Sequence, residues 1–199
     1  MESPVPILLA GFIYVILFGG LSWLRREGLS VRFAVEAVLI TLSVAGLGAL
    51  SSVLIHPVLF LALLYLLTMR VRLLVDVGNL FAQRCQMTRA DRLYTLATRL
   101  WPDASGRLIV QINQGVSLLQ RGELDEAIGL LKEVLQKSTH GYLGVKQEAA
   151  AHYNLGVAYR RKQLEAQAIV EFNTVLETWP ASEYARRAEA ALQQVRHKN

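Results

Sequence analysis

The sequence has little of two kinds of residue, cysteine and charged side chains. Its 199 residues include 1 cysteine, Cys85, so neither a disulfide framework nor a cysteine-built metal site can form within one chain. Charged residues make up 19% of the sequence and hydrophobic residues 53%, whereas roughly 25% and about 45–50% are typical of soluble domains. These values exclude a collagen, a disordered tail and a secreted cystine scaffold, and they indicate a part that does not face water.

Charge is scarcest at the start of the chain, where uncharged runs have the length of membrane spans. Residues 5–24 contain no charge, and about 20 residues suffice for a helix to cross a ~30 Å apolar layer. Residues 33–69 are too long for one crossing, and a glycine- and serine-rich segment at 46–52, followed by Pro57, divides them. The sequence predicts a transmembrane anchor at 1–70 with three spanning helices, at about 5–24, 33–50 and 53–69.

Arginine placement predicts the orientation of this anchor. Arginine favours the cytoplasmic side of a membrane, and Arg25, Arg26 and Arg32 flank the first predicted loop, while Arg70 and Arg72 follow the third span. Three spans therefore place the N-terminus outside and the rest of the chain in the cytoplasm, at a bacterial inner membrane. Two spans remain the alternative, and they would place the last two arginines outside.

Glu36 carries the one charge inside a predicted span, which raises the question of a transport or proton site. It follows Arg32 by four residues, so the two side chains can pair along one helix face near the interface. We interpret Glu36 as an ion-pair partner and not as a transport site.

A pattern of small and large residues recurs three times after the anchor. The copies at 71–104, 108–141 and 149–182 each place a glycine on a first helix and an alanine on a second, so that the two helices can approach closely. These glycine and alanine pairs are Gly78 and Ala90, Gly115 and Ala127, and Gly156 and Ala168.

The third copy carries the most complete signature, namely Leu155, Gly156, Tyr159, Ala168, Phe172 and Pro180. In this spacing the chain resembles the tetratricopeptide repeat family over residues 71–182. Two departures are Thr139 in place of the closing proline of the middle copy and an insertion at 142–148. The resemblance implies an all-α solenoid of three repeats, closed by a capping helix and tail at 183–199. No separate N-terminal cap is visible, so we expect the third span to serve as one.

The sequence shows no catalytic motif. It has no glycine-rich phosphate loop and no paired-histidine metal motif, so we predict no enzyme, no cofactor and no metal. The pI of about 9.6 invites a nucleic-acid partner, but the arginines do not cluster, and several flank the membrane, where anionic lipid is nearer. We therefore predict membrane lipid and no nucleic acid as a partner.

Protein binding is the function that the resemblance implies. The family's first helices line a concave surface, and position-matching assigns to it Val75, Asn79, Ala82, Ile112, Val116, Leu119, Tyr153, Val157 and Arg160. Such a mainly apolar groove suits an amphipathic helix or an extended peptide. The alternative for Ile112 and Val116 is ordinary packing between repeats.

In layout the chain is similar to the membrane-anchored tetratricopeptide factors that assist photosystem I assembly in cyanobacteria and plastids. This similarity implies a scaffold that binds other membrane proteins and assembles or stabilises their complex. The alternative is a permanent accessory subunit of an energy-transducing or transport complex in the membrane.

Overall fold

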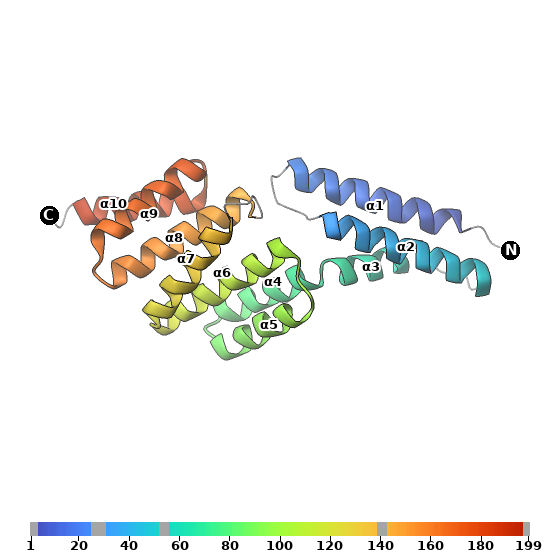
Figure 1. Ribbon diagram of the computed structural model, residues 1–199, viewed down its shortest axis with the longest axis horizontal. Helices are drawn as coiled ribbons and strands as arrows, with labels where there is room; N and C mark the ends of the chain where they lie inside the picture. Colours follow the sequence, from blue (N-terminus) through green and yellow to red (C-terminus); the bar gives the residue numbers. More distant parts are fainter. Residues whose placement is uncertain (1–3, 25–30, 52–55, 139–142, 197–199) are drawn as a thin grey trace.

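The computed structural model describes residues 4–24, 31–51, 56–138 and 143–196, which form ten α-helices and no strand (Figure 1). The predicted all-α fold is confirmed. The helices in chain order are α1 (Val5–Leu24), α2 (Val31–Ser51), α3 (Pro57–Thr68), α4 (Arg70–Gln83), α5 (Met87–Arg99), α6 (Ala104–Arg121), α7 (Leu124–Ser138), α8 (Val145–Arg161), α9 (Glu165–Thr178) and α10 (Glu183–Arg196).

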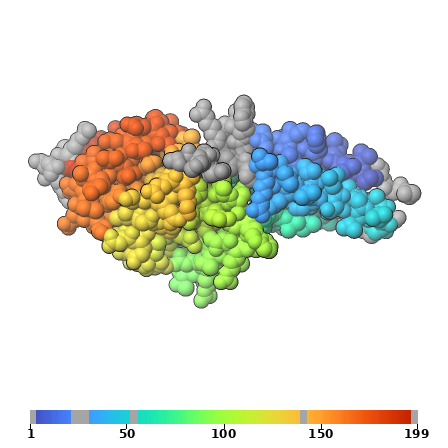
Figure 2. Space-filling model, viewed as in Figure 1, coloured from blue at the N-terminus to red at the C-terminus, as the bar shows by residue number. Residues whose placement is uncertain are grey.

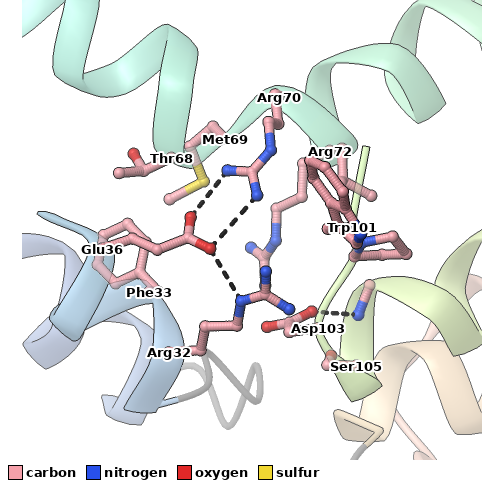
Figure 3. A pocket seen from close by; sticks show the side chains of 13 residues that line it. Arg32, Phe33, Glu36, Thr68, Met69, Arg70, Arg72, Trp101, Asp103 and Ser105 are labelled. Carbon is pink, nitrogen blue, oxygen red and sulfur yellow. Dashed lines mark hydrogen bonds and ion pairs between the residues drawn. The ribbon is translucent and has the colours of Figure 1, made fainter. Parts of the chain in front are cut away.

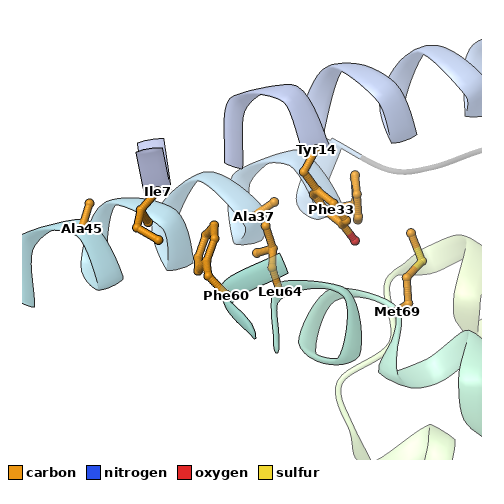
Figure 4. Close-up of a cluster of buried hydrophobic side chains, with 8 residues drawn as sticks. All are labelled: Ile7, Tyr14, Phe33, Ala37, Ala45, Phe60, Leu64 and Met69. Carbon is orange, nitrogen blue, oxygen red and sulfur yellow. The ribbon is translucent and has the colours of Figure 1, made fainter. Parts of the chain in front are cut away.

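The first three helices pack against one another as a separate body beside the other seven (Figures 1 and 2). Gly11 permits the contact between α1 and α2, because a Cβ there would lie 2.3 Å from Thr41 Oγ1. Tyr14 and Thr68 share a hydrogen bond of 2.7 Å between α1 and α3. The apolar core of this body is small and consists of Ile7, Tyr14, Phe33, Ala37, Ala45, Phe60, Leu64 and Met69 (Figure 4).

Most of the apolar surface of α1, α2 and α3 faces outward. Phe12 is 66% exposed, Leu50 87% and Leu59 69%, on three different helices. Beyond these helices, the exposed large hydrophobic side chains of the described residues are Val77, Leu80, Leu96, Trp101, Val170 and Trp179. Exposed apolar surface on this scale marks contact with lipid or with another protein.

The three helices differ in whether they are long and apolar enough to cross a membrane. Among the described residues, α2 alone is long and apolar enough to cross a membrane, and a second crossing requires counting α3 and α4 as one span despite a 73° bend. Helix α3 has 12 residues, or about 18 Å at 1.5 Å per residue. Part of the expected span at 53–69 lies outside the described residues, so three spans stay a prediction.

The start of α3 follows the sequence signals. Pro57 occupies the first turn, as the sequence predicts, and the backbone N–H of Val58 donates to His56 Nδ1 at 3.3 Å. At its other end the bend turns α3 away from α4. Val77 and Leu80 on α4 are exposed, and the expectation that the third span caps the array stays a prediction.

The remaining helices pack in antiparallel pairs, α4 with α5, α6 with α7 and α8 with α9, and α10 packs on α8 and α9. The glycines of the repeated pattern lie where the paired helices touch. A Cβ at Gly78 would lie 2.5 Å from Tyr94 Cε1, and one at Gly156 would lie 2.7 Å from Phe172 Cε1. Close approach of each helix pair therefore requires these glycines, as the spacing predicts.

The turns inside the three pairs share one backbone feature. Cys85 has φ +58°, Gly122 has φ +85° and Gln163 has φ +62°, at the same position of each predicted copy. Glycine adopts this left-handed conformation without a steric cost, whereas other residues lose roughly 1–2 kcal/mol. The agreement in conformation supports the register in which the copies were aligned.

Substitutions at these turns have opposite expected effects. We expect Gln163→Gly to raise the free energy of unfolding by about 1 kcal/mol, because it relieves the strained φ, and Gly122→Ala to lower it by about 1 kcal/mol. Urea unfolding of the full chain in detergent micelles, followed by circular dichroism, measures both. Shifts of the same sign would contradict the shared turn geometry.

The boundaries near the predicted third copy differ from the expectation in one respect. Residues 139–142, including Thr139, lie outside the described residues, but α8 already begins at Val145. Part of the insertion at 142–148 therefore extends a helix instead of lengthening a loop. Helix α10 lies where the capping helix is expected, with Ala185, Ala188 and Leu192 buried against α8 and α9.

Candidate binding groove and its junction with the anchor

Helices α4, α6, α8 and α10 follow one another along the array, and the first three of them carry the predicted groove residues. Three of these residues are buried, Val75 at 3%, Ile112 at 5% and Leu119 at 4% exposure. Each belongs to an apolar cluster between helices, for example Ile112 with Leu131. These three side chains serve packing, and a partner cannot reach them.

The other predicted groove residues are half-buried, and they are Asn79, Ala82, Val116, Tyr153, Val157 and Arg160. The polar ones already have partners within the chain. Asn79 Oδ1 accepts a hydrogen bond of 2.7 Å from the Tyr94 hydroxyl, and Arg160 Nη1 donates to Gln194 Oε1 at 3.2 Å. Of the two half-buried valines, Val157 also packs against two apolar clusters of the array, so Val116 is the simplest anchor point for a bound segment.

Helix α10, which position-matching to the three copies did not include, contacts the predicted groove residue Tyr153. The ring of Tyr153 lies between those of Phe172 and Tyr184, with centroids 5.9 Å and 5.8 Å away. Burial raises the pKa of Tyr184, so its hydroxyl stays protonated at neutral pH. The apolar periodicity at Tyr184 and Ala188 was the signal that α10 packs inward.

Polar contacts hold helices together both within the first pair and between the first and second pairs. Burial and the charge of Asp91 raise the pKa of Tyr94 to about 12, so Tyr94 remains the donor to Asn79. Asp91 also accepts a hydrogen bond of 2.7 Å from Ser117 and pairs with Arg121, both on α6. The first and second pairs are thereby fixed relative to each other.

A second site lies where the anchor meets the array (Figure 3). Arg32 Nε donates to Glu36 Oε1 at 2.8 Å, so the predicted ion pair is present. Glu36 has a further partner that the sequence analysis missed. Arg70, at the start of α4, donates from Nη1 to Glu36 Oε2 at 2.8 Å and from Nη2 to Oε1 at 3.3 Å. Glu36 therefore joins α2 to α4.

Arg70 has two more acceptors, which make it the centre of this junction. Its Nη1 also donates to the carbonyl of Leu67 at 2.7 Å, and its Nε donates to the carbonyl of Leu100 at 3.1 Å. The hydrogen bonds to Glu36 raise the pKa of Arg70, which therefore stays charged. The guanidinium of Arg70 thus links α2, the end of α3 and the loop after α5. In the sequence, the one signal for this role was the position of Arg70 directly after the predicted third span.

The comparisons with known proteins bear on the array. A family model described as tetratricopeptide repeat matches residues 112–183. The N-terminal domain of stress-induced protein-1 from C. elegans is similar in structure, with 17% identity, a TM-score of 0.48, and coverage of 62% of this chain and 95% of that one. No curated protein sequence matches the chain. Residues 112–183 are therefore similar to the tetratricopeptide repeat family, within the part of the chain where the repeated pattern was found.

Proposed function

We propose that the protein is a scaffold anchored in a bacterial inner membrane, whose cytoplasmic repeats bind a protein partner and assemble or stabilise a membrane protein complex. The match of residues 112–183 to tetratricopeptide repeats carries the binding part of this proposal. The copy at 71–104 is proposed as a further repeat, because its glycine contact and its turn at Cys85 repeat those of the matched region.

The exposed apolar surface of α1, α2 and α3 supports the anchor. The three helices run antiparallel, and their charged ends meet the array, with the N-terminus at the far end (Figure 1). Arg32, Glu36 and Arg70 lie at the array end, where arginine belongs if that end is cytoplasmic. This arrangement favours three crossings.

The occupant proposed for the groove is an amphipathic helix or an extended segment of a membrane protein. Val116 and Val157 provide apolar contacts, while Tyr153 adds a ring that is already held in place by its neighbours. Rigid aromatic side chains at the centre of an interface contribute a large share of binding energy.

Changing two half-buried groove residues tests this occupant. We expect Val116→Glu combined with Tyr153→Ala to reduce recovery of the partner in affinity purification at least about tenfold, because a loss of about 1.4 kcal/mol already gives that factor. Val170→Glu is the matched control, since Val170 is 62% exposed on α9 away from the groove. If the folded double variant retains its partner at the wild-type level, the groove is not the binding surface.

The second candidate function is a permanent accessory subunit of an energy-transducing or transport complex. Purification in mild detergent separates the two: near-unit stoichiometry with a mature complex supports the subunit, and sub-stoichiometric recovery with precursors supports assembly. The similar layout of photosystem I assembly factors favours the assembly role. A transporter or an enzyme would instead lose its activity on Glu36→Gln, which we do not expect because Glu36 pairs with two arginines.

A further inference from the structure

Trp101 has an unusual conformation for a large side chain. It lies in the loop between α5 and α6, its side chain is 79% exposed, and its φ is +47°. Bulky residues rarely adopt positive φ, which costs roughly 1–2 kcal/mol. A strained and exposed tryptophan persists only where its surroundings hold it, and such strain often accompanies function.

A second Trp-Pro dipeptide in the same chain shows that the dipeptide itself does not impose this conformation. Trp179 and Pro180 follow α9 at the same position of the third copy, and Trp179 has φ −150° and is 36% exposed. The two tryptophans differ in location. Trp101 lines the pocket that also contains Arg32 and Glu36 of α2, whereas Trp179 lies between α9 and α10, the last two helices.

The residues on both sides of Trp101 are fixed by the junction. The carbonyl of Leu100 accepts the 3.1 Å hydrogen bond from Arg70, and Pro102 is buried. Asp103 caps α6 by accepting from the N–H of Gly106 at 2.7 Å. The indole stands beside Arg72 on the rim of the junction pocket, across from Phe33 and Glu36 of the anchor (Figure 3).

The neighbouring surface of the anchor is apolar at this level. Val31 is 81% exposed at the start of α2, and Leu66 and Leu67 are 57% and 41% exposed at the end of α3. These side chains continue the apolar belt of the anchor up to the arginines of the pocket. Tryptophan is enriched where the apolar layer meets the headgroups, and arginines attract the anionic lipids of the cytoplasmic leaflet.

We propose that Trp101 inserts into the headgroup region of the cytoplasmic leaflet and is a direct contact of the repeat array with lipid. This inference rests on the proposed membrane anchor. The contact holds the first helix pair against the bilayer, in addition to the ion pair between Glu36 and Arg70. A protein partner or open water at Trp101 are the alternatives that the experiment distinguishes.

Tryptophan fluorescence in proteoliposomes tests the proposal, with lipid brominated near the headgroup as the quencher. In vesicles of phosphatidylcholine and phosphatidylglycerol, the full chain with Trp23→Phe and Trp179→Phe reports on Trp101 alone. The matched control, with Trp23→Phe and Trp101→Phe, reports on Trp179. An insertion reference adds Phe12→Trp, near the middle of the predicted span 5–24, to a chain in which all three native tryptophans are replaced by phenylalanine, and its quencher is lipid brominated in mid-chain.

We expect Trp101 to lose about half of its emission, Trp179 to lose almost none and the Phe12→Trp reference to be quenched as well. An unquenched Trp101 beside a quenched reference overturns this inference alone and leaves water or a partner at the indole. A reference that is not quenched overturns the anchor itself. If a variant fails to fold, a spin label is placed at Trp101→Cys in a Cys85→Ser chain. Power-saturation spectroscopy then measures its accessibility to oxygen, which is high in lipid and lower in water or under a protein partner.

Discussion

Replacing Arg70 by methionine is expected to release the array from its fixed position against α2 and α3. The change keeps the apolar stem of the side chain but removes its hydrogen bonds to Glu36 and to the carbonyls of Leu67 and Leu100. Both partners of the ion pair are about a quarter exposed, so we expect a loss of about 2–3 kcal/mol in the contact between α2 and α4.

Distances between two spin labels measure this release. One label is placed on the native Cys85 of the array and the other on Leu42→Cys, an exposed position of the anchor helix α2. We expect a narrow distance distribution for the otherwise unchanged chain in proteoliposomes and a broad one after Arg70→Met. Arg32→Met is the matched control, because Arg32 pairs with Glu36 on the same helix, α2. If Arg70→Met and Arg32→Met broaden the distance distribution equally, Arg70 is not the residue that holds the array in place.

Replacing Phe172 by alanine is expected to lower the free energy of unfolding by about 3–5 kcal/mol. Phe172 is fully buried, and its ring fills the space that Gly156 leaves open between α8 and α9. The ring also supports Tyr153, at 5.9 Å between centroids. Loss of the ring therefore leaves a cavity between these helices and removes the support of a proposed groove residue.

Urea unfolding of the full chain in detergent micelles, followed by circular dichroism, measures this loss. Val170→Ala on the same helix is the control, since Val170 is exposed, and it should change the free energy of unfolding by less than about 0.5 kcal/mol. If Phe172→Ala is no more destabilising than the control, the close packing of Gly156 on Phe172 is not what stabilises this helix pair.

The helix pairs of the array were predictable from the sequence because their contacts are local and periodic. A glycine and an alanine at fixed spacing identify where two helices approach, and Gly78 and Gly156 both lie against an aromatic ring of the following helix. Pro57 likewise marks the start of α3, and Arg32 with Glu36 is a contact within one helix turn. Each of these signals acts over a short stretch of chain.

Contacts between distant segments were not predictable in the same way. The bond from Arg70 to Glu36 joins residues on different helices, next to the 73° bend between α3 and α4. Repeat position also did not separate groove residues from packing residues. Val75 and Ile112 are buried because neighbouring helices cover them, and this cover depends on how the pairs stack.

The side of the membrane on which Cys85 lies tests the central claim most directly. It is the chain's 1 cysteine, and it is exposed in the turn between α4 and α5. A membrane-impermeant maleimide should label it in inside-out vesicles and not in intact spheroplasts, while the protein stays in the membrane after alkaline carbonate extraction. Ser3→Cys in a Cys85→Ser chain should give the opposite labelling. Labelling of Cys85 in intact spheroplasts, or release of the protein by carbonate, would contradict a cytoplasmic array anchored by three membrane helices.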